Sequence, residues 1–433
     1  MTDNMLVVTP LALRDEDVKN LKAQIINYLT PALQNVPSAD LNRKNVRVWL
    51  EKALDNFFPG RVASATVRQQ VVDAAVADLI GYGPLELLLI DPEINEVMVN
   101  GPKMIFVERN GELFETDVTF DDTAHLMHII DRILLPLGRR VDAEMPTADA
   151  RLPDGSRVNV VVPPVAVDGP VVTIRKFPQT RMSIDDFVRL GTITNYMAKF
   201  LEACVVARLN ILITGNTSSG KSTMLNVLST FIPNLERIVT IEDAVELQLK
   251  QRHVVRLETR LPNMDGTGAV NIRDLVKNAL RMRPDRLVVG EVRGGEALDM
   301  LQAMNTGHAG SITTLHANSP RDAIARLETM ALMAGVDLPV TAVRKQISSA
   351  INLVVHMNRL PDGTRKAIQV TELSGMEGDV VTQTDIYKFF PTGVSGEGKV
   401  RGELKPTGLR PLFTPRLELA GYKLGGEYFG LGL

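Results

Sequence analysis

The residues of this chain best suited to chemistry form a glycine-rich segment near its middle. Residues 215–222 fit the pattern G-x-x-x-x-G-K-[ST] at every position. An apolar stretch precedes the segment and a helical pattern follows it, and in this context such a loop wraps backbone N–H groups around phosphate. Lys221 is expected to neutralise the β- and γ-phosphates of ATP, and Ser222 to ligate Mg²⁺. The predicted nucleotide-binding residues are Gly215, Asn216, Thr217, Ser218, Ser219, Gly220, Lys221, Ser222 and Thr223.

Two acidic positions follow apolar, strand-like runs. The run 287–289 leads into Gly290 and Glu291, and the run 237–241 leads into Glu242 and Asp243. A buried strand that brings a carboxylate to the carboxyl edge of a parallel sheet predicts Glu291 as the Walker B acid. Residues 215–222 form the predicted P-loop, and the apolar run at 211–214 is the strand that leads into it. If the strand at 237–241 neighbours this P-loop strand, Glu242 faces the γ-phosphate and orients or deprotonates the attacking water. Glu242 and Glu291 are predicted to hold Mg²⁺ together with Ser222, in part through water; helix capping is the alternative for the pair at 242–243.

Other polar residues near these runs have two interpretations each. His316 closes the run 311–315, whose threonines and final histidine would suit a sensor of the γ-phosphate; an ordinary core histidine is the alternative. Arg273, Arg281 and Arg283 accompany a helical pattern before Glu291, and they form either a solvated face or a charge cluster between subunits.

Composition bounds the class of protein. The chain has 433 residues, which predicts two to four domains, and its 45% hydrophobic and 23% charged residues are typical of a folded protein. A net charge of −3 gives no general basic field, so nucleic acid is not expected as a partner. The single cysteine, Cys204, excludes a disulfide within one chain and a cysteine-built metal cage, and we interpret it as a small buried hydrophobe. We find no signal peptide and no apolar run of about 18 residues, and therefore expect a cytoplasmic protein.

The first half of the chain changes its hydrophobic period once. Residues 14–80 show three helical stripes, which predict a small helical bundle. Strand-like runs at 104–108 and 112–116 flank Asn110-Gly111, a hairpin signal. An amphipathic helix then carries His125 and His128, interpreted as ordinary helix residues, and strands are expected at 157–162 and 171–176. These elements predict a small α+β domain.

The second half alternates between strand-like and helical patterns. After a linker at 177–183, apolar runs occur at 211–214, 238–241, 287–289, 311–315 and 353–356. Their alternation with helical segments predicts a parallel sheet with helices on both faces, as in a RecA-like P-loop domain. Beyond residue 390 the chain is rich in Gly and Pro, and surface loops are expected there.

Several of these segments together resemble a known family. Residues 240–249 (TIEDAVELQL), 281–297 (RMRPDRLVVGEVRGGEA) and 307–320 (GHAGSITTLHANSP) resemble the Asp box, Walker B and His box of the type II/IV secretion ATPase superfamily. Residues 149–159 (DARLPDGSRVN) and 173–177 (TIRKF) resemble its tight-adherence (Flp) pilus branch, the CpaF/TadA ATPases. GYGPLELLL at 81–89 and INEVMVNG at 94–101 extend the match, which covers about 75–375.

The resemblance implies roles for particular residues. Lys221 and Ser222 bind phosphate and Mg²⁺, Glu291 is the Walker B acid, Glu242 the catalytic acid of the Asp box and His316 the His-box residue. Arg157 and Arg175 match arginines that the family's amino-terminal domain turns towards the γ-phosphate. Many extension ATPases of type II secretion and type IV pili carry a four-cysteine zinc module, which a chain with one cysteine cannot build.

The sequence patterns and the resemblance together predict an architecture, and the resemblance also implies partners. We expect a helical domain at 1–78, an α+β (PAS-like) domain at 79–178 that contributes to the nucleotide site, a RecA-like ATPase domain at 184–390 and a tail at 391–433. The expected function is that of a homo-hexameric ATPase that uses ATP and Mg²⁺ to power assembly of a tight-adherence pilus. Its partners would be the platform proteins of the inner membrane, through which it associates peripherally. The alternatives are a type IV secretion traffic ATPase or a pilus retraction motor, a RecA-type nucleic-acid motor, and a switch that binds ATP without turnover.

Overall fold

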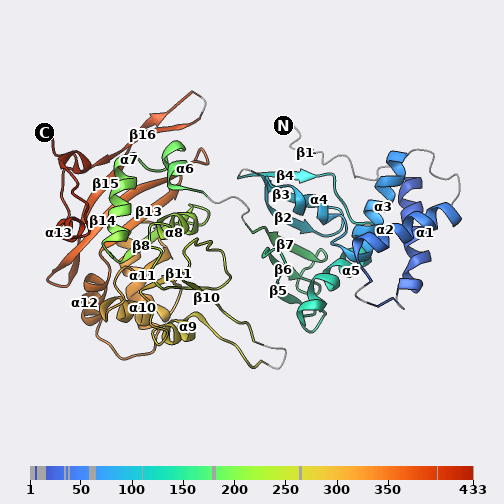
Figure 1. Cartoon of the computed structure of the whole chain (residues 1–433), viewed down its shortest axis with the longest axis horizontal. Coiled ribbons are helices and arrows are strands. Elements are labelled where there is room, and N and C mark those ends of the chain that lie inside the picture. The colour runs from blue at the N-terminus through green and yellow to red at the C-terminus, as the bar shows by residue number, and fades with distance from the viewer. Residues whose placement is uncertain are drawn as a thin grey trace. The chain divides into compact units, whose positions relative to one another are not determined.

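A computed structural model describes residues 5–6, 16–33, 36–37, 40–57, 65–109, 111–177, 182–262, 266–396 and 398–432. The chain divides into two compact units at residues 179 and 180, and each unit is described by itself (Figure 1). Among the described residues, no helix is both long enough and apolar enough to cross a bilayer.

The first unit holds a group of helices and a seven-stranded sheet. Its elements are β1 (Met5–Leu6), α1 (Glu16–Leu33), α2 (Arg43–Phe57), α3 (Ala65–Ile80), α4 (Leu85–Ile90), β2 (Ile94–Asn100), β3 (Ile105–Arg109), β4 (Glu112–Thr116), α5 (Thr123–Leu134), η1 (Leu135–Leu137), β5 (Thr147–Arg151), β6 (Arg157–Val161) and β7 (Val171–Arg175).

Helices α1, α2 and α3 coincide with the three stripes expected between residues 14 and 80. Ile25, Leu50 and Val71, one from each helix, are fully buried in one shared cluster. Such periodic apolar positions form helices because their side chains gather on one face and leave water together.

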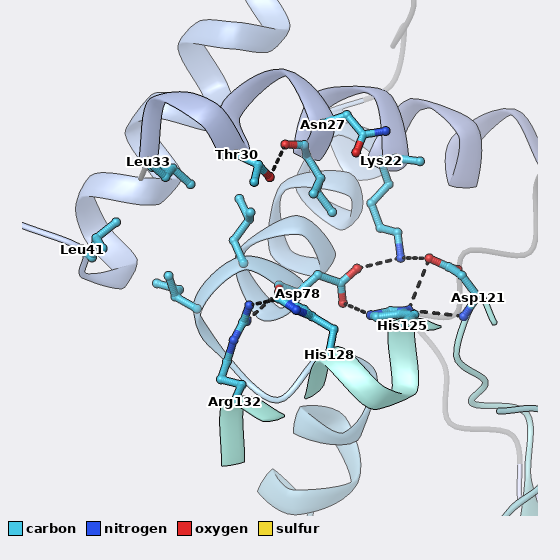
Figure 2. A pocket seen from close by; sticks show the side chains of 14 residues that line it. Lys22, Asn27, Thr30, Leu33, Leu41, Asp78, Asp121, His125, His128 and Arg132 are labelled. Atoms are coloured by element: carbon cyan, nitrogen blue, oxygen red, sulfur yellow. Dashed lines mark hydrogen bonds and ion pairs between the residues drawn. The ribbon is translucent and has the colours of Figure 1, made fainter. Parts of the chain in front are cut away.

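A partly buried ion cluster joins these helices to α5, and Figure 2 shows it at the edge of a pocket. Lys22 of α1 lies 2.7 Å from an Asp78 oxygen on α3 and 2.9 Å from an Asp121 oxygen just before α5. His125 completes the cluster: its Nε2 lies 3.2 Å from Asp78 and its Nδ1 lies 3.4 Å from Asp121. His128 turns elsewhere and accepts from Arg132 at 2.7 Å, so the two histidines do not converge on one point.

The sheet of the first unit has the order β1-β4-β3-β2-β7-β6-β5, antiparallel except for the β1–β4 pair. Strands β3 and β4 form the expected hairpin; Asn110 of its turn lies outside the described residues, and Gly111 has a left-handed φ of 86°. The apolar face of α5 buries Leu126, Ile129 and Ile133 in the cluster formed with the strands.

The second unit contains the P-loop segment and a nine-stranded sheet. Its elements are α6 (Ile184–Arg189), α7 (Asn195–Val206), β8 (Ile211–Gly215), α8 (Lys221–Ser229), β9 (Ile238–Glu242), β10 (Val254–Glu258), α9 (Ile272–Ala279), β11 (Arg286–Val289), α10 (Glu296–Asn305), β12 (Ile312–His316), α11 (Pro320–Leu332), α12 (Val340–Ala350), β13 (Leu353–Arg359), β14 (Arg365–Glu377), β15 (Val380–Val394), β16 (Val400–Pro406), α13 (Thr414–Leu419) and η2 (Gly426–Phe429).

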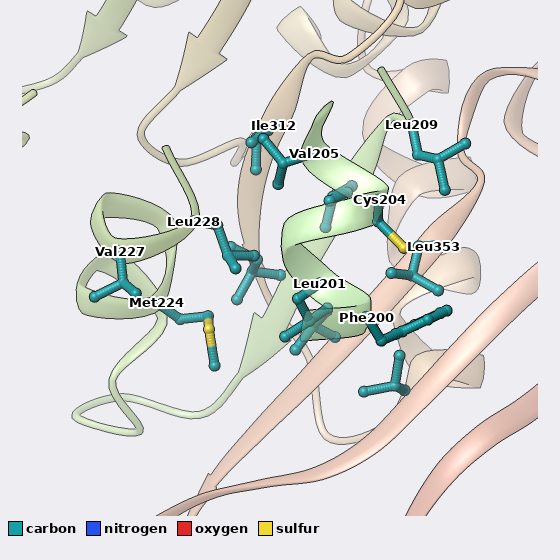
Figure 3. Packing of buried hydrophobic residues seen from close by; sticks show 14 of the residues in the cluster. Phe200, Leu201, Cys204, Val205, Leu209, Met224, Val227, Leu228, Ile312 and Leu353 are labelled. Carbon is teal, nitrogen blue, oxygen red and sulfur yellow. The ribbon is translucent and has the colours of Figure 1, made fainter. Parts of the chain in front are cut away.

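Six parallel strands form one side of this sheet, in the order β10-β9-β11-β12-β8-β13, and β14, β15 and β16 extend it in antiparallel pairs. The five apolar runs identified in the sequence are β8, β9, β11, β12 and β13, so the parallel sheet is confirmed. Helices α7 and α8 pack on one face, where Cys204 is fully buried as expected (Figure 3). Helices α9 to α12 pack on the other face.

The prediction of surface loops after residue 390 is wrong. Strand β15 continues to Val394 and pairs with β16, and the residues that follow return to the core. Phe413, Leu417 and Phe429 are buried in the same cluster as Phe200 of α7. The Gly- and Pro-rich composition hid this packing because these apolar residues are widely spaced and find their partners on α7, more than 200 residues earlier.

Candidate functional site

The P-loop connects β8 to α8 through backbone conformations that need glycine. Gly215 has a φ of 150°, and a Cβ there would lie 2.2 Å from the carbonyl oxygen of Met357. Gly220 begins α8 with a φ of 92°. Ser218 also adopts a left-handed φ of 58°, an uncommon conformation for a residue with a side chain. The sequence therefore forms a tight, defined loop at the carboxyl end of a fully buried strand.

This loop fits a phosphate. A helix amino terminus offers backbone N–H groups and the positive end of the helix dipole to an anion, and α8 begins where the loop ends. Ser219 is buried, and its Oγ has no hydrogen-bond partner among the described residues. Asn216, Thr217, Ser218 and Ser222 are exposed and Thr223 is half-buried, so the remaining loop residues are open to a ligand.

Lys221, His316 and Glu291 meet beside the loop. The Nζ of Lys221 donates to the carbonyl of Asn216 at 2.9 Å and lies 3.3 Å from Nδ1 of His316. The Nε2 of His316 lies 2.8 Å from Oε1 of Glu291. Three residues expected to act on one nucleotide are therefore joined by direct contacts.

The residues that follow β11, which include the Walker B acid Glu291, are hydrogen-bonded to the neighbouring strand β12. Strand β11 is buried throughout, and the Oγ1 of Thr314 on β12 donates to the carbonyl of Gly290 at 2.7 Å. Glu291 follows, and its second oxygen accepts from Arg293 at 2.6 Å. Arg293 also lies 3.2 Å from Asp243, so it links the Walker B acid to the Asp box. The hydroxyl of Thr314 therefore has a structural partner, which departs from its expected part in a phosphate sensor.

Glu242 does not lie on a strand adjacent to the P-loop strand, as its expected role required. Strand β9 is separated from β8 by β11 and β12. Glu242 is buried, and its Oε2 accepts from the backbone N–H groups of Glu246 at 2.7 Å and Leu247 at 3.0 Å. A Cβ on Gly290 would lie 3.0 Å from its Cγ, so this glycine admits the close approach of Glu242. The carboxylate stabilises its own loop beside Glu291, and its action on water stays a prediction.

Arg157 and Arg175 are cross-strand neighbours in the first unit. They are paired in register on β6 and β7, and Arg175 also faces Glu96 on β2. Burial raises the pKa of Glu96, and the charge of Arg175 opposes that shift. Their predicted contact with the γ-phosphate stays a prediction. Arg273, by contrast, has a partner within its own unit, because its Nε donates to Asp299 at 2.7 Å.

Three residues near the loop have no role predicted from the sequence. Arg293 donates to Glu291 at 2.6 Å. Arg365 of β14 donates to the carbonyl of Ser218 at 2.9 Å, and His356 of β13 lies 2.9 Å from the hydroxyl of Thr214. Only Arg293 had a local signal, its place two residues after the Walker B acid. The others depend on the pairing of β13 with β8.

Comparisons with known proteins identify the family of this chain. A family model described as "Type II/IV secretion system protein" matches residues 78–388. A putative conjugal transfer protein of Mycobacterium tuberculosis (strain H37Rv) is 36% identical over 313 residues, which cover 71% of this chain and 88% of that protein. The type IV secretion system protein VirB11 of Brucella suis is 32% identical over 314 residues, covering 66% and 87%.

A solved structure agrees at the level of fold. The ATPase DotB of Yersinia pseudotuberculosis matches with a TM-score of 0.50 at 17% identity, over 67% of this chain and 78% of that one. Since the family model covers well over half of the residues, and the mycobacterial relative exceeds 30% identity across more than two thirds of them, the chain belongs to the type II/IV secretion system protein family.

Proposed function

We propose that this chain binds and hydrolyses ATP at the P-loop around Lys221. The observation that carries the proposal is the contact between Lys221 and His316, which in turn contacts Glu291. A phosphate-binding lysine, a neutral hydrogen-bonding side chain and a carboxylate are the groups that phosphoryl transfer requires, because the reaction depends on positioned charge more than on covalent chemistry.

The chain's own residues have separate tasks in this proposal. The amino end of α8, Ser219 and Lys221 bind the phosphates, and His316 senses the γ-phosphate from beside Lys221. Ser222 and Glu291 would hold Mg²⁺, which neutralises charge on the transferring phosphate. Glu242 remains the candidate to orient water, and Arg157 and Arg175 the candidates to contact the γ-phosphate.

The test is phosphate release from the purified full chain with ATP and Mg²⁺. Lys221→Ala should abolish turnover because it removes the only side-chain cation within the P-loop. Lys250→Ala is the matched control, because it also removes one lysine but from an exposed position. The neighbouring Gln251 donates to the carbonyls of Ser229 and Ile232, which places this control at the end of α8 opposite the P-loop. Phosphate release by Lys221→Ala at the wild-type rate would disprove the P-loop assignment. No release by wild type would leave a switch that binds ATP without turnover.

We further propose that hydrolysis powers assembly of a tight-adherence pilus, by a ring of six chains at a membrane platform. The resemblance of residues 149–159 and 173–177 to that branch supports this proposal. A second candidate is a type IV secretion traffic ATPase, which is favoured by the relatives named conjugal transfer protein and VirB11. A retraction motor shares the same chemistry and differs in the direction of work.

Deletion of the gene distinguishes the pilus motor, the traffic ATPase and the retraction motor. Loss of surface pili with normal transfer of DNA or protein supports the pilus motor, and the reverse supports the traffic ATPase. Pili that form but no longer retract indicate the retraction motor. A nucleic-acid motor is disfavoured by the net charge of −3, and nucleic acid should not stimulate hydrolysis.

A further inference from the structure

We propose that His356 is a positioning residue for ATP hydrolysis, whose imidazole holds the segment after His316 across the carboxyl end of the P-loop strand. The inference rests on the proposed ATPase function and adds to it a residue that touches neither nucleotide nor Mg²⁺.

His356 bridges two loops of the site from a buried position. Only 3% of the residue is exposed. Its Nδ1 lies 2.9 Å from Oγ1 of Thr214, the residue directly before Gly215. The ring also donates to the backbone of Asn318, two residues after His316. One side chain therefore holds both the entry to the P-loop and the exit from the His-box strand.

The order of the strands shows what this bridge accomplishes. Strand β8 lies between β12 and β13. On one side His316 pairs in register with Gly215, and on the other side His356 pairs with Thr214. For Asn318 to reach His356, the segment 316–318 must cross the carboxyl end of β8. The crossing lies at the base of the P-loop, and His356 is its anchor on the far side.

The crossing segment is held at both ends. At its start, His316 contacts Lys221 and Glu291. After Asn318, Ser319 caps α11 by accepting from the N–H of Asp322 at 3.0 Å. Without the hydrogen bond to His356, the segment between His316 and Ser319 would lose the one described side-chain contact that holds it to β13. A displacement of about 1 Å at such a position can cost about 10²-fold in rate.

The fold keeps the ring of this bridge neutral. Burial lowers the pKa of His356 to about 4 against the opposing effect of the Asn318 carbonyl, and Lys221 adds to the lowering. A neutral ring that donates to the Asn318 carbonyl through one nitrogen accepts from the hydroxyl of Thr214 through the other, whereas a protonated ring would donate at both. The bridge therefore keeps the same donors and acceptors throughout the pH range in which the enzyme would work.

Paired variants of the full chain test the proposal. His356→Leu removes both contacts, and Thr214→Val removes the hydroxyl without changing the shape of the side chain. Each should lower kcat for phosphate release by about 10- to 100-fold and leave the Kd for ADP within about threefold of wild type. Thr214→Ser, which keeps the hydroxyl, should retain kcat within about threefold. The double variant should be no slower than the slower single variant, because both act through one contact.

A second readout does not need turnover. Hydrogen exchange of a peptide spanning residues 312–320 should speed up in His356→Leu with ADP bound, while the peptide that contains β11 should stay unchanged. If wild type hydrolyses no ATP, the proposed function fails, and this exchange result still decides whether His356 anchors the segment.

Two results would overturn the inference. One is a kcat in Thr214→Val and folded His356→Leu equal to wild type, with only the thermal midpoint lowered, which would make His356 a core residue. The other is unchanged exchange of residues 312–320. If His356→Leu does not fold, Thr214→Val against Thr214→Ser decides alone.

Discussion

Lys221 and His316 lie in contact beside the P-loop, with the lysine Nζ 3.3 Å from the imidazole Nδ1. An ammonium group only donates, so Nδ1 must accept and the proton of a neutral ring resides on Nε2. That Nε2 lies 2.8 Å from Glu291, which can accept the proton's hydrogen bond. A neutral His316 therefore satisfies the P-loop cation and the Walker B carboxylate at once, and a protonated one does not.

Turnover should therefore fall on acidification. Burial lowers the pKa of His316, with Lys221 and Arg293 adding to this effect and Glu291 opposing it. The ring is then neutral at pH 7 and takes up its proton below the ordinary histidine range near pH 6.5. We expect a constant kcat from about pH 8 to about pH 6.5 and a decline at lower pH, measured by phosphate release at saturating ATP. His316→Gln, which cannot titrate, should show a lower rate without this decline; the same decline in both proteins would contradict the assignment.

Glu291→Gln should bind ATP and retain it. The amide keeps the shape of the side chain but removes the charge that contacts His316 and Arg293. Hydrolysis should slow by about 10²- to 10³-fold, the effect of removing one group that stabilises transition-state charge. The measurement is the nucleotide that remains with the protein after long incubation with ATP and gel filtration. Glu328→Gln, which removes a separate ion pair with Arg344, is the control and should yield ADP. Recovery of ADP alone from Glu291→Gln would return Glu291 to a structural role.

Arg157→Ala and Arg175→Ala should each lower turnover and leave ADP affinity nearly intact. The two arginines are paired across β6 and β7, so they present charge at one place on the sheet. An arginine that donates to a transferring phosphate contributes about 10³- to 10⁵-fold where it acts as a finger. Steady-state phosphate release and ADP titration measure the two effects. Arg140→Ala, an exposed residue paired with Asp142, is the control for loss of charge from the same unit. Normal hydrolysis by both variants would mean that these residues do not serve the nucleotide.

The elements of this fold were predictable to the extent that they depend on local pattern. The five apolar runs of the second unit are strands because each has enough Val, Ile and Leu to be buried on both faces. The P-loop was predictable because its glycines encode a backbone conformation at fixed spacing. The order of the strands is not local: nothing near Glu242 indicates that β11 and β12 lie between β9 and β8.

The same reason explains the residues that sequence reasoning missed. His356 and Thr214 are 142 positions apart, and they meet only because β13 pairs in parallel with β8. Arg365 reaches Ser218 across 147 positions, through the hairpin that β13 and β14 form. A histidine within a strand, such as His356, or an arginine at the start of one, such as Arg365, has no distinguishing pattern of its own, so its partner must be known before its role can be inferred.

The attachment of α1 and α3 to α5 should weaken as pH rises above neutrality. Burial by itself lowers the pKa of His125, but hydrogen bonds to Asp121 and Asp78 outweigh it and raise the pKa to about 9. A folded-state pKa above the unfolded value of about 6.5 gives stability that is fully present below that pH and is lost as pH passes 9. The loss should be about 2 kcal/mol after allowance for solvent screening.

The only tryptophan of the chain makes this measurable. Trp49 packs against the cluster formed by α1, α2 and α3, so its fluorescence follows their unfolding in urea. The urea midpoint of wild type should fall between about pH 6.5 and 9.5, and that of His125→Gln should stay constant over this range. His128→Gln is the matched control on the same helix, because burial and Arg132 lower the pKa of His128 and it is already neutral. A pH dependence that survives His125→Gln would assign the effect to another group.

The last prediction concerns assembly. A single chain that closes on its own nucleotide has no neighbour to move, so directional work at a membrane platform requires a ring in which each copy transmits its change to the next. A head-to-tail interface that closes by rotation yields such a ring. Of the arginines before β11 that could supply charge to this interface, Arg273 is already paired with Asp299, whereas Arg281 and Arg283 are exposed.

We therefore expect a hexamer that nucleotide favours, with specific activity that falls on dilution below the assembly threshold. Light scattering with a non-hydrolysable ATP analogue should give six times the chain mass of 47.5 kDa. The double variant Arg281→Glu and Arg283→Glu should shift assembly to higher protein concentration if these charges lie in the interface, and Lys250→Glu should not. A monomer that keeps full specific activity at every dilution would contradict the ring and the motor function that depends on it.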